Sequence, residues 1–162
     1  MRKRAAARSS SSPALSSREA TALDNSILES KIGYQIRMTD RVLGRDFLDY
    51  VGLTRPQYSV LSLVATNDDL SQAEVGKSLD MDRASTMAVV DKLESAGLIE
   101  RRISVVDKRM HALQLTEAGR KAFPALNRKV VEHENSYMKR LSATEQTLLF
   151  ECLTKIRQGT AE

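Results

Sequence analysis

The residues best suited to bind a polyanion lie between positions 100 and 109. The basic and acidic side chains of this stretch are Glu100, Arg101, Arg102, Asp107, Lys108 and Arg109. Guanidinium and ammonium groups are the side chains that contact phosphates and base edges in nucleic acids. This local excess of positive charge predicts a nucleic-acid surface.

The overall charge gives weaker support for such a surface. The chain of 162 residues has a net charge of +4 and a pI near 9.3. Residues 1–18 carry five basic and no acidic side chains, so removing their +5 from +4 leaves −1. That segment is rich in Ser and Ala and has few apolar residues to bury, which predicts a disordered basic tail over residues 1–23. The expected folded part is not basic overall, and DNA binding must depend on where charges cluster.

The sequence contains none of the residue patterns that are typical of a catalytic site. It contains no glycine-rich phosphate loop, no nucleophile elbow and no spacing that suggests a Ser/His/Asp site. Two histidines, His111 and His133, and the single Cys152 are too few to indicate a zinc site. We therefore expect neither an enzyme nor a cofactor. One cysteine excludes an intramolecular disulfide and is typical of a cytoplasmic protein, and no window is apolar enough for a membrane span.

Capping signals define the central helices. Thr54 and Gln57 form one predicted capping box, and Ser71 and Glu74 form a second after a polar turn. Asp82 is placed to cap a third helix, which Gly97 would end. A short helix, a turn and a second helix at this spacing predict a helix-turn-helix.

A different periodicity follows Gly97. Apolar and polar residues alternate over 98–104 and 109–116, with a polar, basic segment between them. Leu113 and Leu115 share one face and would anchor the pair of strands to the helices. The pattern predicts a hairpin, or wing.

Long helices flank this unit. Apolar spacing predicts one helix from 24 to about 50, another over 116–137 that is kinked or tightened near Pro124, and a last one starting at Ser142. The expected apolar stripe of the last helix is Leu148, Leu149, Cys152, Leu153 and Ile156, with Cys152 as a core residue. A second subunit is the expected cover for these faces. The fold class is therefore mainly α with a small β-wing, a winged helix-turn-helix that dimerises through its N- and C-terminal helices.

Residues 25–158 resemble the MarR family of bacterial regulators. The matching segments, in order, are Leu70 to Gly76, Asp82 to Thr86, Leu93 to Arg101, Asp107 to Arg109 and Leu113 to Gly119. The resemblance implies a homodimer on a palindromic double-stranded DNA operator, with repression as the default. It also implies a single domain over 24–162, with dimerisation helices at 24–52 and 117–162 and a DNA-binding unit at 54–116.

The resemblance assigns DNA contacts to nine residues. Base or near-base contacts fall to the start of the recognition helix, at Arg83, Ser85 and Thr86, although Arg83 is also suited to a phosphate. Ser71, Gln72 and Lys92 would face phosphates; the alternatives are capping for Ser71 and a plain surface charge for Lys92. In the wing, Asp107 would hold Arg109 in the minor groove beside Lys108 on a phosphate; the alternative is an ordinary polar tip. Many family members carry another arginine where this chain has Ala88, which leaves the sequence preference open.

The family also commonly binds small aromatic anions. Here the candidate ligand residues are Tyr34, Arg37, Met38, Arg41 and Tyr58, with Arg45 extending a basic stripe. The effector would be an aromatic acid or an aryl-coenzyme A thioester. The alternative is a solvated face paired with Asp40 and Asp46. A rival interpretation of the whole chain is a helical dimerisation or adaptor protein that has lost DNA binding.

Overall fold

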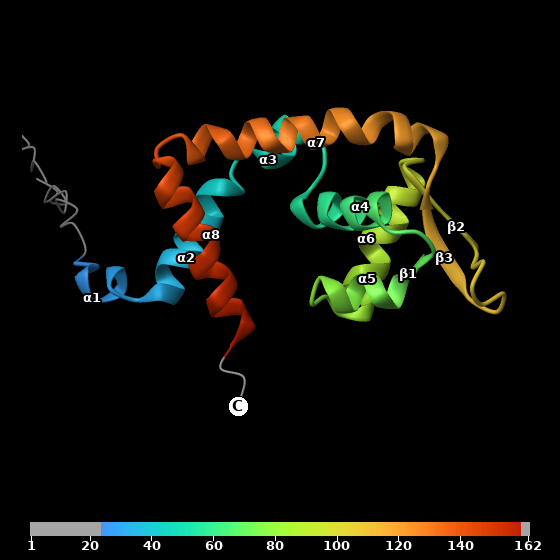
Figure 1. Cartoon of the computed structure of the whole chain (residues 1–162), viewed down its shortest axis with the longest axis horizontal. Helices are drawn as coiled ribbons and strands as arrows, with labels where there is room; N and C mark the ends of the chain where they lie inside the picture. Colours follow the sequence, from blue (N-terminus) through green and yellow to red (C-terminus); the bar gives the residue numbers. More distant parts are fainter. Residues whose placement is uncertain (1–23, 160–162) are drawn as a thin grey trace, which may run out of the picture. The chain divides into compact units, whose positions relative to one another are not determined.

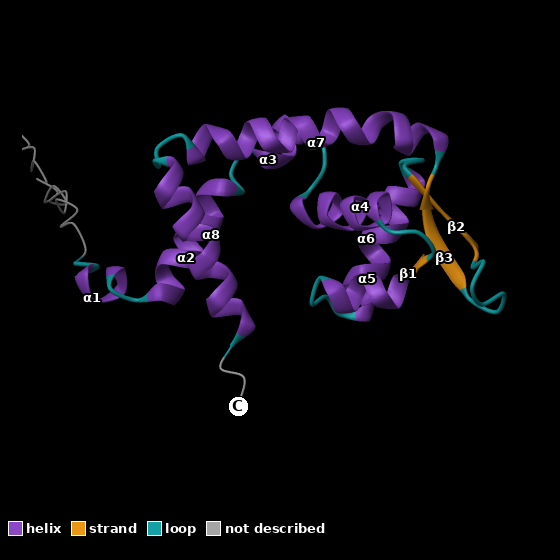
Figure 2. Cartoon of the chain, in the orientation of Figure 1, coloured by secondary structure: helices purple, strands orange, loops and turns teal. Residues whose placement is uncertain are grey.

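The computed structural model describes residues 24–159, so the expected tail at residues 1–23 lies outside the described residues. The chain separates into two units, one ending at Ile36 and the other beginning at Arg37. Most of the described residues are helical, and three short strands form one sheet (Figure 2). None of the described helices is both long enough and apolar enough to cross a membrane.

The expectation of a single helix from 24 to about 50 is wrong, because the structure divides this segment into three helices. They are α1 (Ser26–Glu29), α2 (Ile32–Leu43) and α3 (Phe47–Val51). Ser30 ends α1, and its hydroxyl donates to the carbonyl of Ile27 instead of continuing the helix. The second break falls at Gly44, a poor helix residue, and Asp46 starts α3. Gly52 then ends α3 in the left-handed conformation with φ 89°, as expected.

The helix-turn-helix expectation is confirmed. It consists of α5 (Gln72–Ser78) and α6 (Arg83–Ser95). Helix α4 (Arg55–Thr66) precedes them, and the three helices lie together next to the strands (Figure 1). Both capping boxes are present, at Thr54 and at Ser71. Asp82 accepts a hydrogen bond from the amide of Ser85 and so begins α6. Local side-chain caps therefore set the start of each of these helices.

The wing is an antiparallel hairpin of β2 (Ile99–Ile103) and β3 (His111–Leu115). A third strand, β1 (Leu70–Ser71), pairs with the other edge of β3 in the order β1-β3-β2. Two residues are too few to show alternation, so the sequence did not predict β1. This pairing joins the wing to the start of α5.

One apolar cluster holds the second unit together. Its fully buried members come from helices and strands alike: Val51, Val60, Leu61, Val75, Val90, Leu93, Ile99 and Leu113. Leu113 and Leu115 are buried as expected. Burial of these side chains is the main force that fixes the wing and the three helices as one body.

The two C-terminal helices are α7 (Glu117–Met138) and α8 (Ala143–Gln158). Helix α7 continues through Pro124, and α8 starts at the predicted capping box of Ser142. No residue of α8 is buried within the chain, and Cys152 is exposed. Cys152 is therefore not a core residue within one chain, where the apolar stripe of α8 is exposed except for the half-buried Leu153.

Candidate nucleic-acid interface

The N-terminal end of α6 presents a free cation. Arg83 is exposed, and it forms no hydrogen bond or ion pair with any of the described residues. Ser85 is also exposed, but its hydroxyl donates to Asp82 Oδ2 at 2.6 Å. The hydrogen bonds from Ser85 lower the pKa of Asp82, which keeps the cap ionised. Arg83 is therefore available for an outside partner, whereas Ser85 can offer only its remaining lone pairs.

Thr86 is not available to DNA, contrary to the expectation. Its side chain is 1 % exposed, and its hydroxyl donates to the carbonyl of Asp82 at 2.8 Å. A Cβ added to Gly76 would lie 2.9 Å from Thr86 Oγ1, so α5 and α6 approach each other closely at this point. Thr86 packs the two helices together, and we propose no base contact for it.

Met87 is a surface residue that the sequence analysis did not single out. It is 50 % exposed, and Ala84 and Ala88 beside it are exposed as well. Met87 lies four residues after Arg83, so the two share one face of α6. This four-residue spacing from Arg83 was the sequence signal that could have identified Met87 as a surface residue. The outward face of α6 thus combines one arginine with an apolar surface.

The start of α5 is capped as the alternative interpretation predicted. Ser71 Oγ accepts from the amide of Glu74 and donates to its carboxylate at 2.6 Å. Gln72 Oε1 accepts from Arg101 at 3.3 Å. Both side chains are half-buried. They lie at the surface between α6 and the wing, with part of their hydrogen-bonding capacity already used.

Two arginines of the basic cluster are neutralised within the chain. Arg101 forms ion pairs with Asp91 at 2.6 Å and with Glu94, both on α6. Arg102 pairs with Glu100 at 2.7 Å. Arg101 therefore fixes α6 to β2, and Lys108 and Arg109 are the basic residues of the cluster that lie at the tip of the wing. Lys92 is exposed near the end of α6, next to Asp91.

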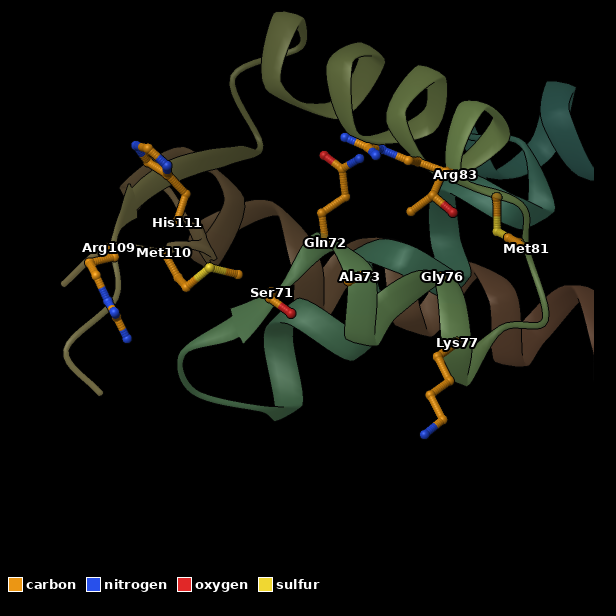
Figure 3. Close-up of a pocket in the computed structure, with 11 residues that line it drawn as sticks. Ser71, Gln72, Ala73, Gly76, Lys77, Met81, Arg83, Arg109, Met110 and His111 are labelled. Carbon is orange, nitrogen blue, oxygen red and sulfur yellow. The ribbon is translucent and has the colours of Figure 1, made fainter. Parts of the chain in front are cut away.

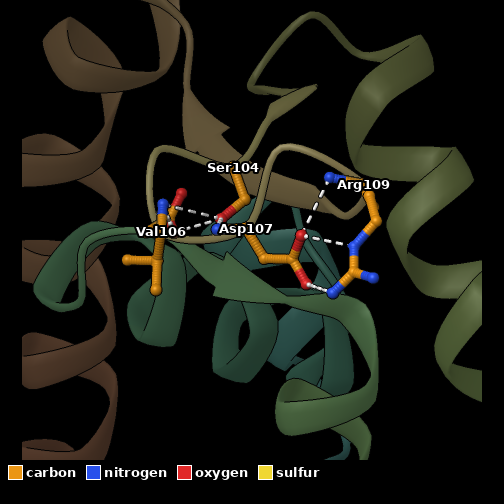
Figure 4. A network of polar contacts seen from close by, with 5 residues as sticks. Ser104, Val106, Asp107 and Arg109 are labelled. Atoms are coloured by element: carbon orange, nitrogen blue, oxygen red, sulfur yellow. Dashed lines mark hydrogen bonds and ion pairs between the residues drawn. The ribbon is translucent and has the colours of Figure 1, made fainter.

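Asp107 holds Arg109 at the tip of the wing (Figure 4). Its carboxylate accepts from the Arg109 amide at 3.0 Å, from Nε at 3.1 Å and from the guanidinium NH2 group at 3.2 Å. These bonds lower the pKa of Asp107, the guanidinium having the larger effect. The Arg109 side chain is nevertheless 89 % exposed. The result is an oriented guanidinium that faces solvent.

A cavity of about 560 Å³ brings these parts together. Figure 3 shows Ser71 and Gln72 between Arg109 and His111 of the wing and Arg83 of α6. Lys77 adds a further cation to the lining. Residues separated by up to 40 positions, from Ser71 to His111, therefore line one concave, cationic surface.

The candidate ligand residues are not gathered in this way. Tyr34 belongs to the first unit and the other four to the second. Tyr58 is half-buried and donates to Asn127 at 2.6 Å. Asp40 pairs with Arg55, and Asp46 binds His133 and Tyr137, so neither acid is paired with Arg41 or Arg45. A cavity of about 460 Å³ between Asp40, Arg55 and Met81 is lined by none of the five candidates.

No group of His, Cys, Asp or Glu side chains within residues 24–159 has the arrangement of a metal site.

The described fold and surface define the class: a winged helix-turn-helix protein, with helix α6 and an arginine-tipped wing on one cationic face. A model of the MarR family matches residues 51–110, which contain α6, β2 and the tip of the wing with Arg109.

Solved structures extend the match over most of the chain. The transcriptional repressor CouR bound to a 23-mer DNA duplex is 30 % identical with a TM-score of 0.78, over 85 % of this chain and 99 % of that one. CouR bound to p-coumaroyl-CoA is 29 % identical with a TM-score of 0.75, over 82 % and 95 %. The HTH-type transcriptional regulator YdgJ of Bacillus subtilis is 27 % identical over 81 % of this chain and 80 % of its own. The chain belongs to the MarR family, whose members are transcriptional regulators and not enzymes.

Proposed function

We propose that this regulator binds double-stranded DNA through α6, the start of α5 and the wing, and that it represses transcription. The observation that carries this proposal is Arg109, which donates three hydrogen bonds to the Asp107 carboxylate while its side chain stays 89 % exposed. A narrow minor groove concentrates negative potential and attracts such a guanidinium. The DNA-bound structure of the similar repressor CouR supports the same role here. As a DNA-binding regulator the protein would act in the cytoplasm, at the nucleoid.

The proposed contacts follow the exposed groups of this surface. Arg83 would read a guanine or bind a phosphate in the major groove, and Met87 would pack against thymine methyl groups. Ser85 would contribute as an acceptor. Phosphate contacts are proposed for Ser71, Gln72, Lys92 and Lys108.

We further propose that the protein is a homodimer on a palindromic operator. Leu148, Leu149 and Ile156 of the α8 stripe are 38–56 % exposed within the described part of one chain. A helix face this apolar is normally buried against a partner. Residues 24–52 and 117–162 would form the dimer, and residues 54–116 of each copy would bind one half-site. The two α6 helices would then enter major grooves about 34–36 Å apart.

An aromatic acid or its coenzyme A thioester is the proposed effector that relieves repression. The support is the p-coumaroyl-CoA complex of CouR and the basic stripe of Arg37, Arg41 and Arg45 in the sequence. Calorimetric titration with benzoate-type acids and their thioesters tests this. Binding that also releases DNA supports it, and no binding by any of them contradicts it.

DNA binding itself is tested by fluorescence anisotropy on the DNA upstream of its own gene, over a range of salt concentrations. A protein that neutralises phosphates must lose affinity steeply as salt rises. Arg109→Ala should weaken binding at least about tenfold, or roughly 1.4 kcal/mol. Arg102→Ala is the matched control, since it removes the same charge from the same hairpin at a residue that does not line the cavity. Salt-independent or absent binding would favour an adaptor protein instead.

A further inference from the structure

The tip of the wing is fastened to the turn that precedes β1. Asp69, in that turn, accepts from the hydroxyl of Ser104 at 2.5 Å, from the amide of Val105 at 3.0 Å and from the amide of Val106 at 3.2 Å. Asp69 has a φ of 55°, which turns the chain back toward the wing. A single carboxylate thus binds three successive residues that lie 35 to 37 positions further along the sequence.

Ser104 links Asp69 to Asp107 by hydrogen bonds. Its side chain is only 7 % exposed, and its oxygen accepts from the amides of Val106 at 3.1 Å and Asp107 at 3.0 Å (Figure 4). Asp107 in turn binds Arg109. A continuous series of hydrogen bonds therefore leads from Asp69 through Ser104 and Asp107 to the exposed guanidinium.

Packing cannot hold this tip. Val105 and Val106 are 79 % and 85 % exposed, so their side chains bury almost no apolar surface. A loop without buried contacts samples many conformations unless its backbone groups are bound. The amides of both valines donate to Asp69, which makes this carboxylate a restraint on the tip in addition to the backbone hydrogen bonds that Met110 makes with Ser104 and Asp107.

We propose that Asp69 and Ser104 are positioning residues for DNA binding, which hold the wing in the conformation that presents Arg109 to the minor groove. This inference rests on the proposed DNA-binding function. Neither residue needs to touch DNA. A wing that is ordered before binding loses less conformational freedom in the complex, so its affinity is higher.

Charge and position make opposite predictions for Asp69→Asn. If Asp69 acts only as a negative charge near phosphates, removing that charge tightens DNA binding. If it positions the wing, the amide cannot accept all three hydrogen bonds, and affinity falls by about three- to tenfold. Asn tolerates the left-handed backbone of this position, so the substitution adds no strain there. Asp68→Asn is the matched control, because it removes the same charge from the adjacent exposed residue and should leave binding unchanged or slightly tighter.

A double-mutant cycle tests whether Asp69 acts through Arg109. We expect Asp69→Asn to weaken binding in the wild-type background and to have almost no effect in the Arg109→Ala background. Ser104→Ala should behave in the same way. Equal losses in both backgrounds, or an Asp69→Asn variant that binds as tightly as wild type, would overturn the proposal.

Amide hydrogen exchange on the free protein gives a second measurement. The amides of Val105, Val106 and Asp107 should exchange faster in Asp69→Asn than in wild type, whereas those of α6 should not change. Unchanged exchange rates of these tip amides would overturn the proposal that Asp69 restrains the tip. If wild-type protein binds no DNA, the proposed function fails and the role in DNA binding with it, while exchange still reports whether Asp69 orders the tip.

Discussion

Gly119→Ala should destabilise the protein strongly, because α7 begins against the backbone of another segment. An added Cβ would overlap the carbonyl oxygen of Leu98 and lie 2.9 Å from its carbonyl carbon. The same carbonyl accepts from the amide of Thr116 at 3.1 Å, and the Thr116 hydroxyl donates to Gly97 at 2.5 Å. Neither backbone can rotate away, so α7 must retreat and lengthen these bonds.

The magnitude follows from three contributions. Overpacking against backbone belongs at the upper end of its range, about 3 kcal/mol. A weakened hydrogen bond to Leu98 adds about 1 kcal/mol, and replacing glycine by alanine in a helix returns about 1 kcal/mol. The expected loss is therefore about 3 kcal/mol of the free energy of unfolding, a large part of the 5–15 kcal/mol that typical domains have.

Urea denaturation at a fixed protein concentration measures this loss, since the stability of a dimer depends on concentration. Gly97→Ala is the control in the neighbouring turn. Its Cβ would meet nothing within 4 Å, but its φ of 69° is strained for alanine, which costs about 1–2 kcal/mol. If Gly119→Ala were no less stable than Gly97→Ala, the close approach would not govern the seating of α7 and the reasoning would fail.

Three further outcomes are expected. Leu148→Glu should convert the dimer to monomers in sedimentation experiments, because it places a charge on the exposed stripe of α8; an unchanged dimer would count against that interface. Met87→Ala should weaken operator binding by about fivefold without changing thermal stability, and equal affinity would remove Met87 from the contacts. Hydrogen bonds lower the pKa of Asp69, from Ser104 first, and that of Asp107, from Arg109 first. Their contribution to wing order is therefore complete above about pH 4 and lost as pH falls through the lowered values. Protection of the tip amides, measured relative to their intrinsic exchange rate at each pH, should therefore stay constant above pH 5, and a loss of protection that begins above pH 5 would contradict this.

The DNA-facing surface was predictable only in part. Asp107 and Arg109 are two residues apart, so their contact follows from local geometry and was expected. Thr86 was misplaced, because its burial depends on how closely α5 approaches α6 at Gly76. Arg101 was counted among the free basic residues, because its partners on α6 are seven and ten positions away and carry no sequence signal.

The sequence alone determined the elements whose ends are set by neighbouring residues. Capping boxes at Thr54, Ser71 and Ser142 need a partner only three residues away, and alternation along the hairpin reflects the backbone itself. Tertiary structure decided what depends on distant partners. The break at Asp46 coincides with its contacts to α7, 87 and 91 positions further on, and Asp69 binds the wing across 35 positions. Such contacts form only when the fold has closed the intervening chain, so no local pattern predicts them.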